Sequence, residues 1–170
     1  MTNLFQNNVV STFPDITKID FIKINKKYLK VILLNISLYF LLLLIGLILW
    51  DIYFLNEQIP NQKIYIYLCL ILVFLFLYTV FIIGFSKRKY AVREKDISYK
   101  SGILFKKTTT VPYNRVQHIE IDQGPFSRIF KLAAISVYTA GDSSDDLKIS
   151  GILKEDAIQI KEFISNKIDG

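Results

Sequence analysis

The sequence has few residues of the kinds that carry metal, thiol or cofactor chemistry. Its 170 residues include one Cys, one His and one Trp. A single cysteine cannot form an intrachain disulfide, and one cysteine with one histidine is too few for a Cys/His zinc site. His118 precedes Glu120 on the same side of an expected strand, but neither a nucleophile motif nor a glycine-rich phosphate loop accompanies this pair. We therefore predict a protein that is not an enzyme and needs no cofactor or metal.

Two long stretches lack charged residues and histidine altogether. They are residues 31–50, of which fifteen are Leu, Ile, Val or Phe, and residues 64–85. At a rise of 1.5 Å per residue, either stretch can cross a hydrocarbon core of about 30 Å as a helix. A core helix of a soluble protein would show a shorter run or a polar stripe. The sequence therefore predicts a transmembrane hairpin, with spans at 31–50 and 64–85 joined by a short external loop at 51–63.

The charges around these stretches predict the orientation of the chain. The net charge of +6 divides into +3 in residues 1–30, −1 in residues 51–63 and +4 after the second span. Lysine and arginine are retained on the cytoplasmic side of a membrane. We therefore expect a multi-pass protein of the cell membrane with both termini cytoplasmic. Residues 14–30 of the N-terminal segment can lie on the membrane or pack against a soluble domain, and the sequence leaves both possibilities open.

After residue 85 the pattern changes to that of one small cytoplasmic domain, residues 86–170. Short alternating segments predict strands at 88–93, 97–100, 103–111, 116–123, 135–139 and 147–149, with one helical turn at 126–130. The closing segment changes period, because apolar residues recur every three or four positions at Leu153, Ala157, Ile160, Ile164 and Ile168. The predicted fold class is α+β, mainly β: a bent antiparallel sheet of six or seven strands with a C-terminal helix.

Three short motifs follow one another within this domain. Residues 112–117 read Pro-Tyr-Asn-Arg-Val-Gln, residues 123–132 read Gln-Gly-Pro-Phe-Ser-Arg-Ile-Phe-Lys-Leu, and residues 138–141 read Tyr-Thr-Ala-Gly. In this order behind a two-span hairpin, they resemble the signature of the YdbS-like family of bacterial pleckstrin-homology domain membrane proteins. The resemblance implies a pleckstrin-homology-like fold, no established enzymatic activity and, as companion, a larger membrane protein with several copies of the domain. The motif residues, expected to be mostly structural, are Pro112, Arg115, Gln117, Gly124, Pro125, Arg128, Leu132, Thr139 and Gly141.

Three positions of these motifs raise separate questions. The family usually has glycine before Leu132, whereas this chain has Lys131. If the turn there needs a positive φ, a lysine is strained by about 1 kcal/mol. Arg115 and Arg128 have two possible roles, because a guanidinium can tie loop carbonyls and a carboxylate together or can bind a phosphate.

Two functions fit these observations. The first is a non-catalytic, membrane-anchored interaction module, an accessory subunit whose partner is another membrane protein. The alternative is a lipid sensor that binds anionic headgroups, because each basic residue near a membrane surface contributes about 1 kcal/mol. Its candidate contacts are Lys87, Arg88, Lys89, Lys106 and Lys107. Nucleic-acid binding is not expected, because many basic residues flank the spans rather than forming a soluble basic face.

Overall fold

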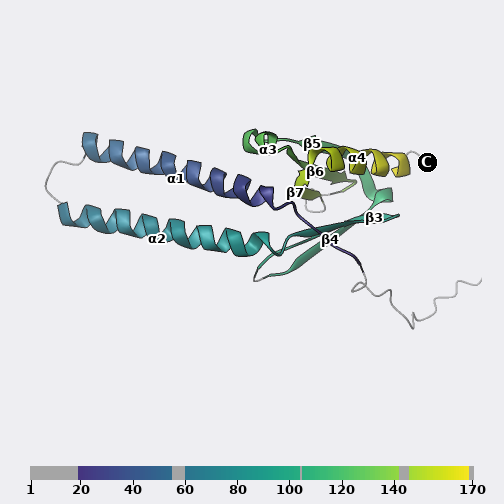
Figure 1. Ribbon diagram of the computed structural model, residues 1–170, viewed down its shortest axis with the longest axis horizontal. Coiled ribbons are helices and arrows are strands. Elements are labelled where there is room, and N and C mark those ends of the chain that lie inside the picture. The colour runs from purple at the N-terminus through teal and green to yellow at the C-terminus, as the bar shows by residue number, and fades with distance from the viewer. Residues whose placement is uncertain (1–18, 55–59, 104, 142–145, 169–170) are drawn as a thin grey trace, which may run out of the picture.

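Two long antiparallel helices extend from one end of a compact domain (Figure 1). The computed structural model describes residues 19–54, 60–103, 105–141 and 146–168. The two helices are α1, Lys27–Phe54, and α2, Pro60–Phe85. Both are long and apolar enough to cross a membrane, and within their most apolar windows only 11% of residues in α1 and none in α2 are buried. A helix that exposes apolar side chains on nearly all sides suits a lipid environment rather than water.

The helices are longer than the apolar runs that predict them. α1 begins four residues before position 31 and continues to Phe54, so part of the predicted loop 51–63 is helical, while residues 55–59 lie outside the described part. Between the helices, the rings of Phe40 and Phe74 stack with centroids 4.2 Å apart. Asn35, a polar residue within the first span, donates its side-chain amide to the carbonyl of Val31 on its own helix at 2.9 Å.

The domain confirms the predicted α+β class, with one difference in the arrangement of the strands. They form two antiparallel sheets, in the orders β1-β2-β3-β4 and β5-β6-β7. A 3-10 turn, η2, separates β4 from β5 and follows Pro112, which has no N–H to continue a ladder. The elements are β1 Ile22–Lys23, β2 Lys89–Val92, β3 Asp96–Ser101, β4 Lys107–Pro112, η2 Tyr113–Arg115, β5 Val116–Asp122, α3 Pro125–Ile129, β6 Leu132–Thr139, β7 Leu147–Leu153 and α4 Lys154–Ile168.

Several strand boundaries differ from those predicted. The strand expected at 103–111 begins only at Lys107, because the chain turns at Gly102, whose φ is 108°. β6 begins at Leu132 rather than 135, and β7 continues to Leu153 rather than 149, because Leu132 and Leu153 pair across the two strands. The two extensions pair with each other at the end of β6 where that strand begins. Successive residues of β6 are buried there, so the alternation of buried and exposed residues on which the prediction depends is lost.

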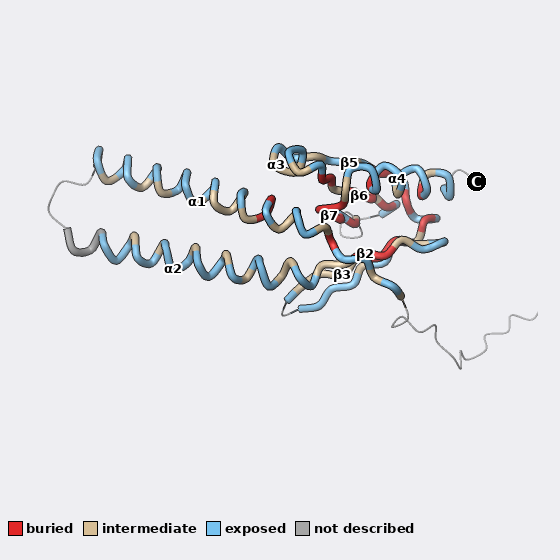
Figure 2. Tube along the Cα trace, in the orientation of Figure 1, coloured by how far each residue is buried: buried red, intermediate tan, exposed pale blue. Residues whose placement is uncertain are grey.

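The hydrophobic core lies between the two sheets and under α4. α4 contacts all three strands of the second sheet, and its Ala157 and Ile164 are fully buried. Buried residues are concentrated in the domain, whereas the described residues of α1 and α2 are exposed or half-buried except at the base of α1 (Figure 2). The predicted C-terminal helix therefore covers one sheet and completes the core.

The described residues before α1, 19–26, pack against the domain rather than lying apart from it on the membrane, while residues 14–18 lie outside the described part. β1 pairs antiparallel with β2, and Ile24 is 3% exposed within the core. Asn25 donates its N–H to the carbonyl of Gly151 in β7 at 3.1 Å. Because a strand before the helical pair joins a strand after it, both flanks of the pair lie on the same side of the helices (Figure 1).

Candidate functional site

The basic residues after α2 lie where the helix gives way to the first sheet. Lys87 and Arg88 form the turn, with their N–H groups donating to the carbonyls of Gly84 and Phe85 at 3.2 and 3.1 Å. Lys89 is the first residue of β2. The turn therefore holds these three predicted residues within one helical turn of the end of the apolar span.

Register places Lys89 in a row with two lysines that the sequence analysis did not select. Lys89 lies opposite Lys23 of β1 on one side and opposite Lys100 of β3 on the other. Directly opposed residues share a face of the sheet, and like charges in such positions are destabilising. The Lys100 ammonium lies 4.1 Å from the centroid of the Phe21 ring, which offsets part of this cost. This lysine row (Lys23, Lys89 and Lys100) is a concentrated positive surface at the end of the sheet near α2.

The β3–β4 hairpin brings Lys106 and Lys107 to the same end of the domain. The hairpin lies beside the end of α2 (Figure 1). The Ile103 side chain approaches Gly84 of α2 so closely that a Cβ atom added to this glycine would lie 3.0 Å from Ile103 Cδ1. Phe105 is 89% exposed. An exposed aromatic ring next to two lysines is a composition suited to the boundary between lipid and water.

A shallow cavity of about 300 Å³ runs along β4, the last strand of the first sheet. It is lined by the whole of β4, Lys107–Pro112, together with Arg115 and Thr139. β4 pairs only with β3 among the described strands, so its other edge faces this cavity. Thr139 is 7% exposed, and its buried hydroxyl has no hydrogen-bond partner among the described residues. The predicted motif residues Pro112, Arg115 and Thr139 therefore meet at one open strand edge.

The glycines and proline of the motifs occupy turns. Gly124 is the N-cap of α3, and its carbonyl accepts the N–H of Arg128 at 2.9 Å, while Pro125 occupies the first turn. Gly141 has a φ of 146° at the end of β6. Gln117 is exposed in β5 at the register shift between Val116 and His118.

Lys131 adopts the positive φ that the sequence analysis considered, at 56°. Its carbonyl accepts the N–H of Lys154 at 3.0 Å, which joins the end of α3 to the start of α4. Leu132, the next residue, is fully buried, and its carbonyl accepts the Gln123 side-chain amide at 2.8 Å. The left-handed turn therefore directs Leu132 into the core.

Arg128 lines a hollow with several other basic residues. The hollow is lined by four basic residues, Lys27, Arg128, Lys131 and Lys154, together with Gln123, Leu153 and Glu155. The Arg128 side chain is exposed, and none of the ion pairs between described residues includes it. The hollow therefore brings Arg128 together with three lysines, Lys27, Lys131 and Lys154.

His118 lies on the exposed face of the second sheet. Its ring stacks on Tyr138 with centroids 4.3 Å apart, and its Nε2 is 3.7 Å from Glu120. The Tyr138 hydroxyl donates to Glu120 at 3.1 Å, and this hydrogen bond raises the pKa of Tyr138.

Within the described ranges, no group of three His, Cys, Asp or Glu side chains could hold a metal ion. Asp146, which precedes β7, accepts the N–H of Thr139 at 3.0 Å.

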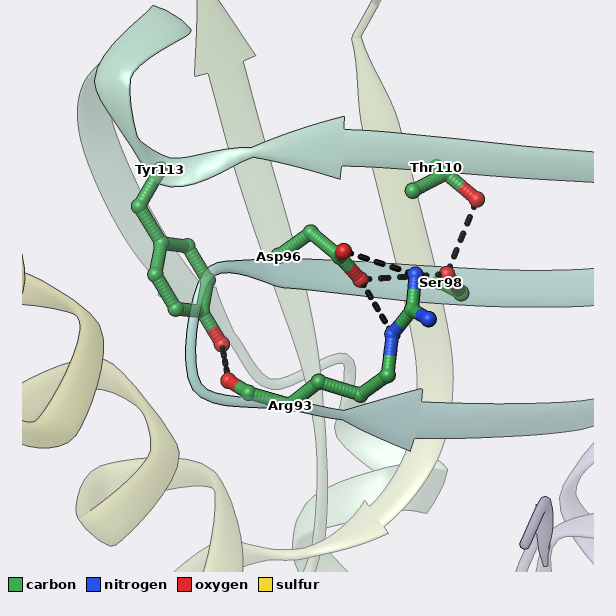
Figure 3. Close-up of polar contacts among 5 residues, drawn as sticks. All are labelled: Arg93, Asp96, Ser98, Thr110 and Tyr113. Carbon is green, nitrogen blue, oxygen red and sulfur yellow. Dashed lines mark hydrogen bonds and ion pairs between the residues drawn. The ribbon is translucent and has the colours of Figure 1, made fainter. Parts of the chain in front are cut away.

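A polar cluster fastens the β2–β3 turn to η2 (Figure 3). The Arg93 guanidinium makes two bonds to the Asp96 carboxylate, at 2.7 and 2.6 Å. The Tyr113 hydroxyl donates to the Arg93 carbonyl at 2.6 Å, and Ser98 and Thr110 share a hydrogen bond of 2.8 Å across β3 and β4. These contacts hold the first sheet against the turn that carries Arg115.

The sequence held no sufficient signal for either of the two missed lysines. Strands predicted at 88–93 and 97–100 imply a turn centred on residue 95, which would place residue 100 opposite residue 90, whereas the observed register pairs Lys89 with Lys100. Lys23 could not be selected, because β1 has only two residues and so shows no period.

Comparisons with known proteins agree with this architecture. A family model described as Bacterial PH domain matches residues 29–168. Transmembrane protein YdbS of Bacillus subtilis (strain 168) is 34% identical over 90 residues, which are 51% of this chain and 55% of that protein. The match therefore spans about half the length of this relative. Among solved structures, a protein with a pleckstrin-homology domain from Shewanella loihica PV-4 aligns with a TM-score of 0.37 and 19% identity, over 48% of this chain and 70% of that one.

Proposed function

The chain belongs to the bacterial PH domain family, and from this premise we propose that it is a non-catalytic, membrane-anchored interaction module that serves as an accessory subunit of a membrane protein complex. A relative that is a transmembrane protein and two helices of membrane-spanning length support the anchor. The proposed partner is another membrane protein, such as a larger relative with several copies of the domain.

The open edge of β4 carries this proposal. Unpaired strand edges are templates for pairing with another chain, and an extended peptide can add to them as a further strand. The cavity along β4 leaves room for the side chains of such a peptide. The unpaired Thr139 hydroxyl at its wall supports an incoming partner, because buried polar groups normally find one. We therefore expect an extended segment of the partner to pair with residues of β4.

Photo-crosslinking in native membranes tests this site on the full chain. A photoreactive amino acid replaces Thr108 of β4 in one variant and Lys161 of α4 in the other, since both positions are exposed. We expect one discrete membrane-protein adduct from position 108 and none from position 161, with its identity read by mass spectrometry. Equal labelling from both positions, or none from position 108, contradicts the proposal.

Binding of anionic headgroups is a second candidate function, and the lysine row favours it. Three opposed lysines repel one another, so an anionic group at this surface would relieve a cost already present in the fold. Lys87, Arg88, Lys106 and Lys107 lie at the same end of the domain and would add to the attraction.

A charge-matched pair of variants tests this candidate in lipid nanodiscs. Lys106→Glu with Lys107→Glu reverses two charges near the end of α2, whereas Lys95→Glu with Lys161→Glu reverses two elsewhere. We expect only the first pair to lower the enrichment of phosphatidylglycerol over phosphatidylcholine, and the loss to shrink in high salt. Equal enrichment in both double variants would rule out these lysines as headgroup contacts.

A further inference from the structure

A large groove lies between the end of α2 and the β3–β4 hairpin. Its volume is about 880 Å³, within the usual range of small-molecule sites. One wall is the outer face of α2 and the other is the hairpin with the neighbouring strands. Its apolar lining includes Phe76, Val80, Phe81, Ile103 and Phe105, and its polar end includes Arg88, Lys148 and two serines.

The close approach of hairpin and helix depends on Gly84. A Cβ at this position would lie 3.0 and 3.2 Å from two atoms of Ile103, so a larger residue would push the hairpin tip away from α2. With glycine there, the Ile103 side chain closes the groove at its base. The Phe105 ring, 89% exposed, is available to cover whatever the groove holds.

The position of the groove along α2 matches one leaflet of a bilayer. From Phe76 to the helix end at Phe85 the axis rises about 14 Å, close to half of a hydrocarbon core of about 30 Å. The apolar part of the groove therefore lies at the depth of acyl chains in the leaflet on the domain's side. Arg88, three residues beyond the helix end, lies at the depth of the headgroups.

The polar end carries positive charge suited to a phosphate. Arg88 is half-buried near Tyr99, where burial raises the pKa of the tyrosine and the guanidinium lowers it. The Lys148 ammonium is 3.2 Å from the Asp122 carboxylate, which neutralises much of its charge. None of the ion pairs between described residues involves Arg88, so its guanidinium supplies most of the attraction for an anion.

We propose that this groove binds one phospholipid from the leaflet on the domain's side, with an acyl chain along Phe76, Val80 and Phe81 and its phosphate beside Arg88. The groove is apolar where a chain would lie and cationic where a phosphate would lie. The site is separate from the open edge of β4, so it does not depend on the proposed interaction with a partner protein. It shares Arg88 with the proposed headgroup-binding surface and rests on that second candidate function for the phosphate only, while Val80→Trp tests the acyl-chain site separately. The bound lipid would fill the space between helix and hairpin and so fix the domain against the span.

Photo-crosslinking with a phosphatidylglycerol that carries a diazirine on one acyl chain tests the site in the full-length protein. Two matched pairs of variants distinguish specific binding in the groove from non-specific contact of bilayer lipids with the helices. Val80→Trp fills the groove, whereas Leu72→Trp places the same ring on an exposed part of α2 outside it. Arg88→Gln removes the charge at the polar end of the groove, whereas Lys161→Gln removes an exposed charge on α4, outside the groove.

We expect adducts concentrated on groove residues in the unaltered protein and in the Leu72→Trp and Lys161→Gln variants. Val80→Trp should abolish these adducts. Arg88→Gln should reduce phospholipid retained through purification, counted by native mass spectrometry, by about tenfold, as expected for loss of a charge-assisted contact. Labels spread evenly over α2, or equal effects within either pair, overturn the proposal. Thermal unfolding of every variant identifies any that fails to fold, and the other pair then decides the outcome.

Discussion

At the scale of single residues, Tyr113 is a buried group whose hydrogen bond holds two turns together. Its hydroxyl is the donor to the Arg93 carbonyl at 2.6 Å, and the residue is 4% exposed. Tyr113→Phe leaves that carbonyl without this donor, so we expect the free energy of unfolding to fall by about 1–2 kcal/mol. Thermal unfolding of the full chain in detergent measures the change. Tyr138→Phe, on the exposed face, is the control and should have a smaller effect.

The same residue predicts a loss of stability in alkaline solution. Burial, with a smaller contribution from the Asp96 charge, raises the pKa of Tyr113 from 10 to about 12. The protonated form is favoured in the folded state, so its contribution is complete below pH 10 and is lost as the pH rises toward 12. Tyr113→Phe should therefore lose less stability over this window than the unaltered protein. Buried Tyr90 and half-buried Tyr99, whose pKa values are also raised, are present in both proteins, so only the difference between the two declines reports on Tyr113. An identical decline in both proteins would contradict the assignment.

Lys131 is a residue whose side chain is unfavourable for the backbone conformation that it adopts. Its φ of 56° is a left-handed conformation that costs a residue with a Cβ about 1 kcal/mol or more. Lys131→Gly removes this strain, although it adds freedom to the unfolded chain, so we expect a net stabilisation of about 0.5–1 kcal/mol. Lys131→Ala keeps the strain and removes only the charge. A rise in the melting temperature with alanine equal to that with glycine would show that charge, not conformation, is responsible.

At the scale of elements, the first turn of α1 packs closely against β7 at one glycine, Gly151. Gly151 has a φ of 88°, and a Cβ there would lie 2.4 Å from Cγ of Tyr28 in the first turn of α1. Gly151→Ala must displace the helix or the strand, so we expect a loss of about 1–3 kcal/mol. Gly124→Ala, at a position with open space and a φ of −71°, is the control and should change little.

A second substitution separates the contact at Gly151 from the backbone effect. If the Tyr28 ring is the obstacle, Tyr28→Ala combined with Gly151→Ala should cost less than the sum of the two single changes. Full additivity of the two unfolding free energies would instead assign the whole effect to the positive φ.

How far each element could be predicted depends on how strong its local pattern is. The two spans and α4 follow from charge-free length and from spacings of three and four, because these patterns persist over many residues. β1 could not be predicted, because its two residues join the sheet only through β2, more than sixty positions later. The groove was missed for a related reason. Its walls, α2 and the β3–β4 hairpin, were predicted separately, but nothing local indicates that Ile103 lies against Gly84.

At the scale of the whole molecule, charge distribution and fold together predict how the chain crosses the membrane. The flanking lysines predict that both ends are cytoplasmic, and the pairing of β1 with β2 requires the two flanks to share one side. In a chain with Cys69→Ser, we expect a membrane-impermeant maleimide to label a Glu57→Cys variant in intact cells. Asp20→Cys and Glu162→Cys variants should be labelled only after lysis.

The opposite accessibility, with positions 20 and 162 labelled in intact cells, would reverse the predicted orientation without disturbing the fold. Labelling of position 20 from one side and position 162 from the other is the result that the β1–β2 pairing forbids.

The two-residue strand β1 also sets an order of events during synthesis. The ribosome makes Ile22 and Lys23 before either span, and their partners, Tyr90 and Lys89, only after both. The first sheet can therefore close only once the second span has returned the chain to the starting side. A chain in which one span failed to insert would keep these strands apart and leave the edge of β2 exposed, a state that quality-control proteases can distinguish from the finished protein. In this chain, completion of the first sheet therefore depends on the passage of both spans.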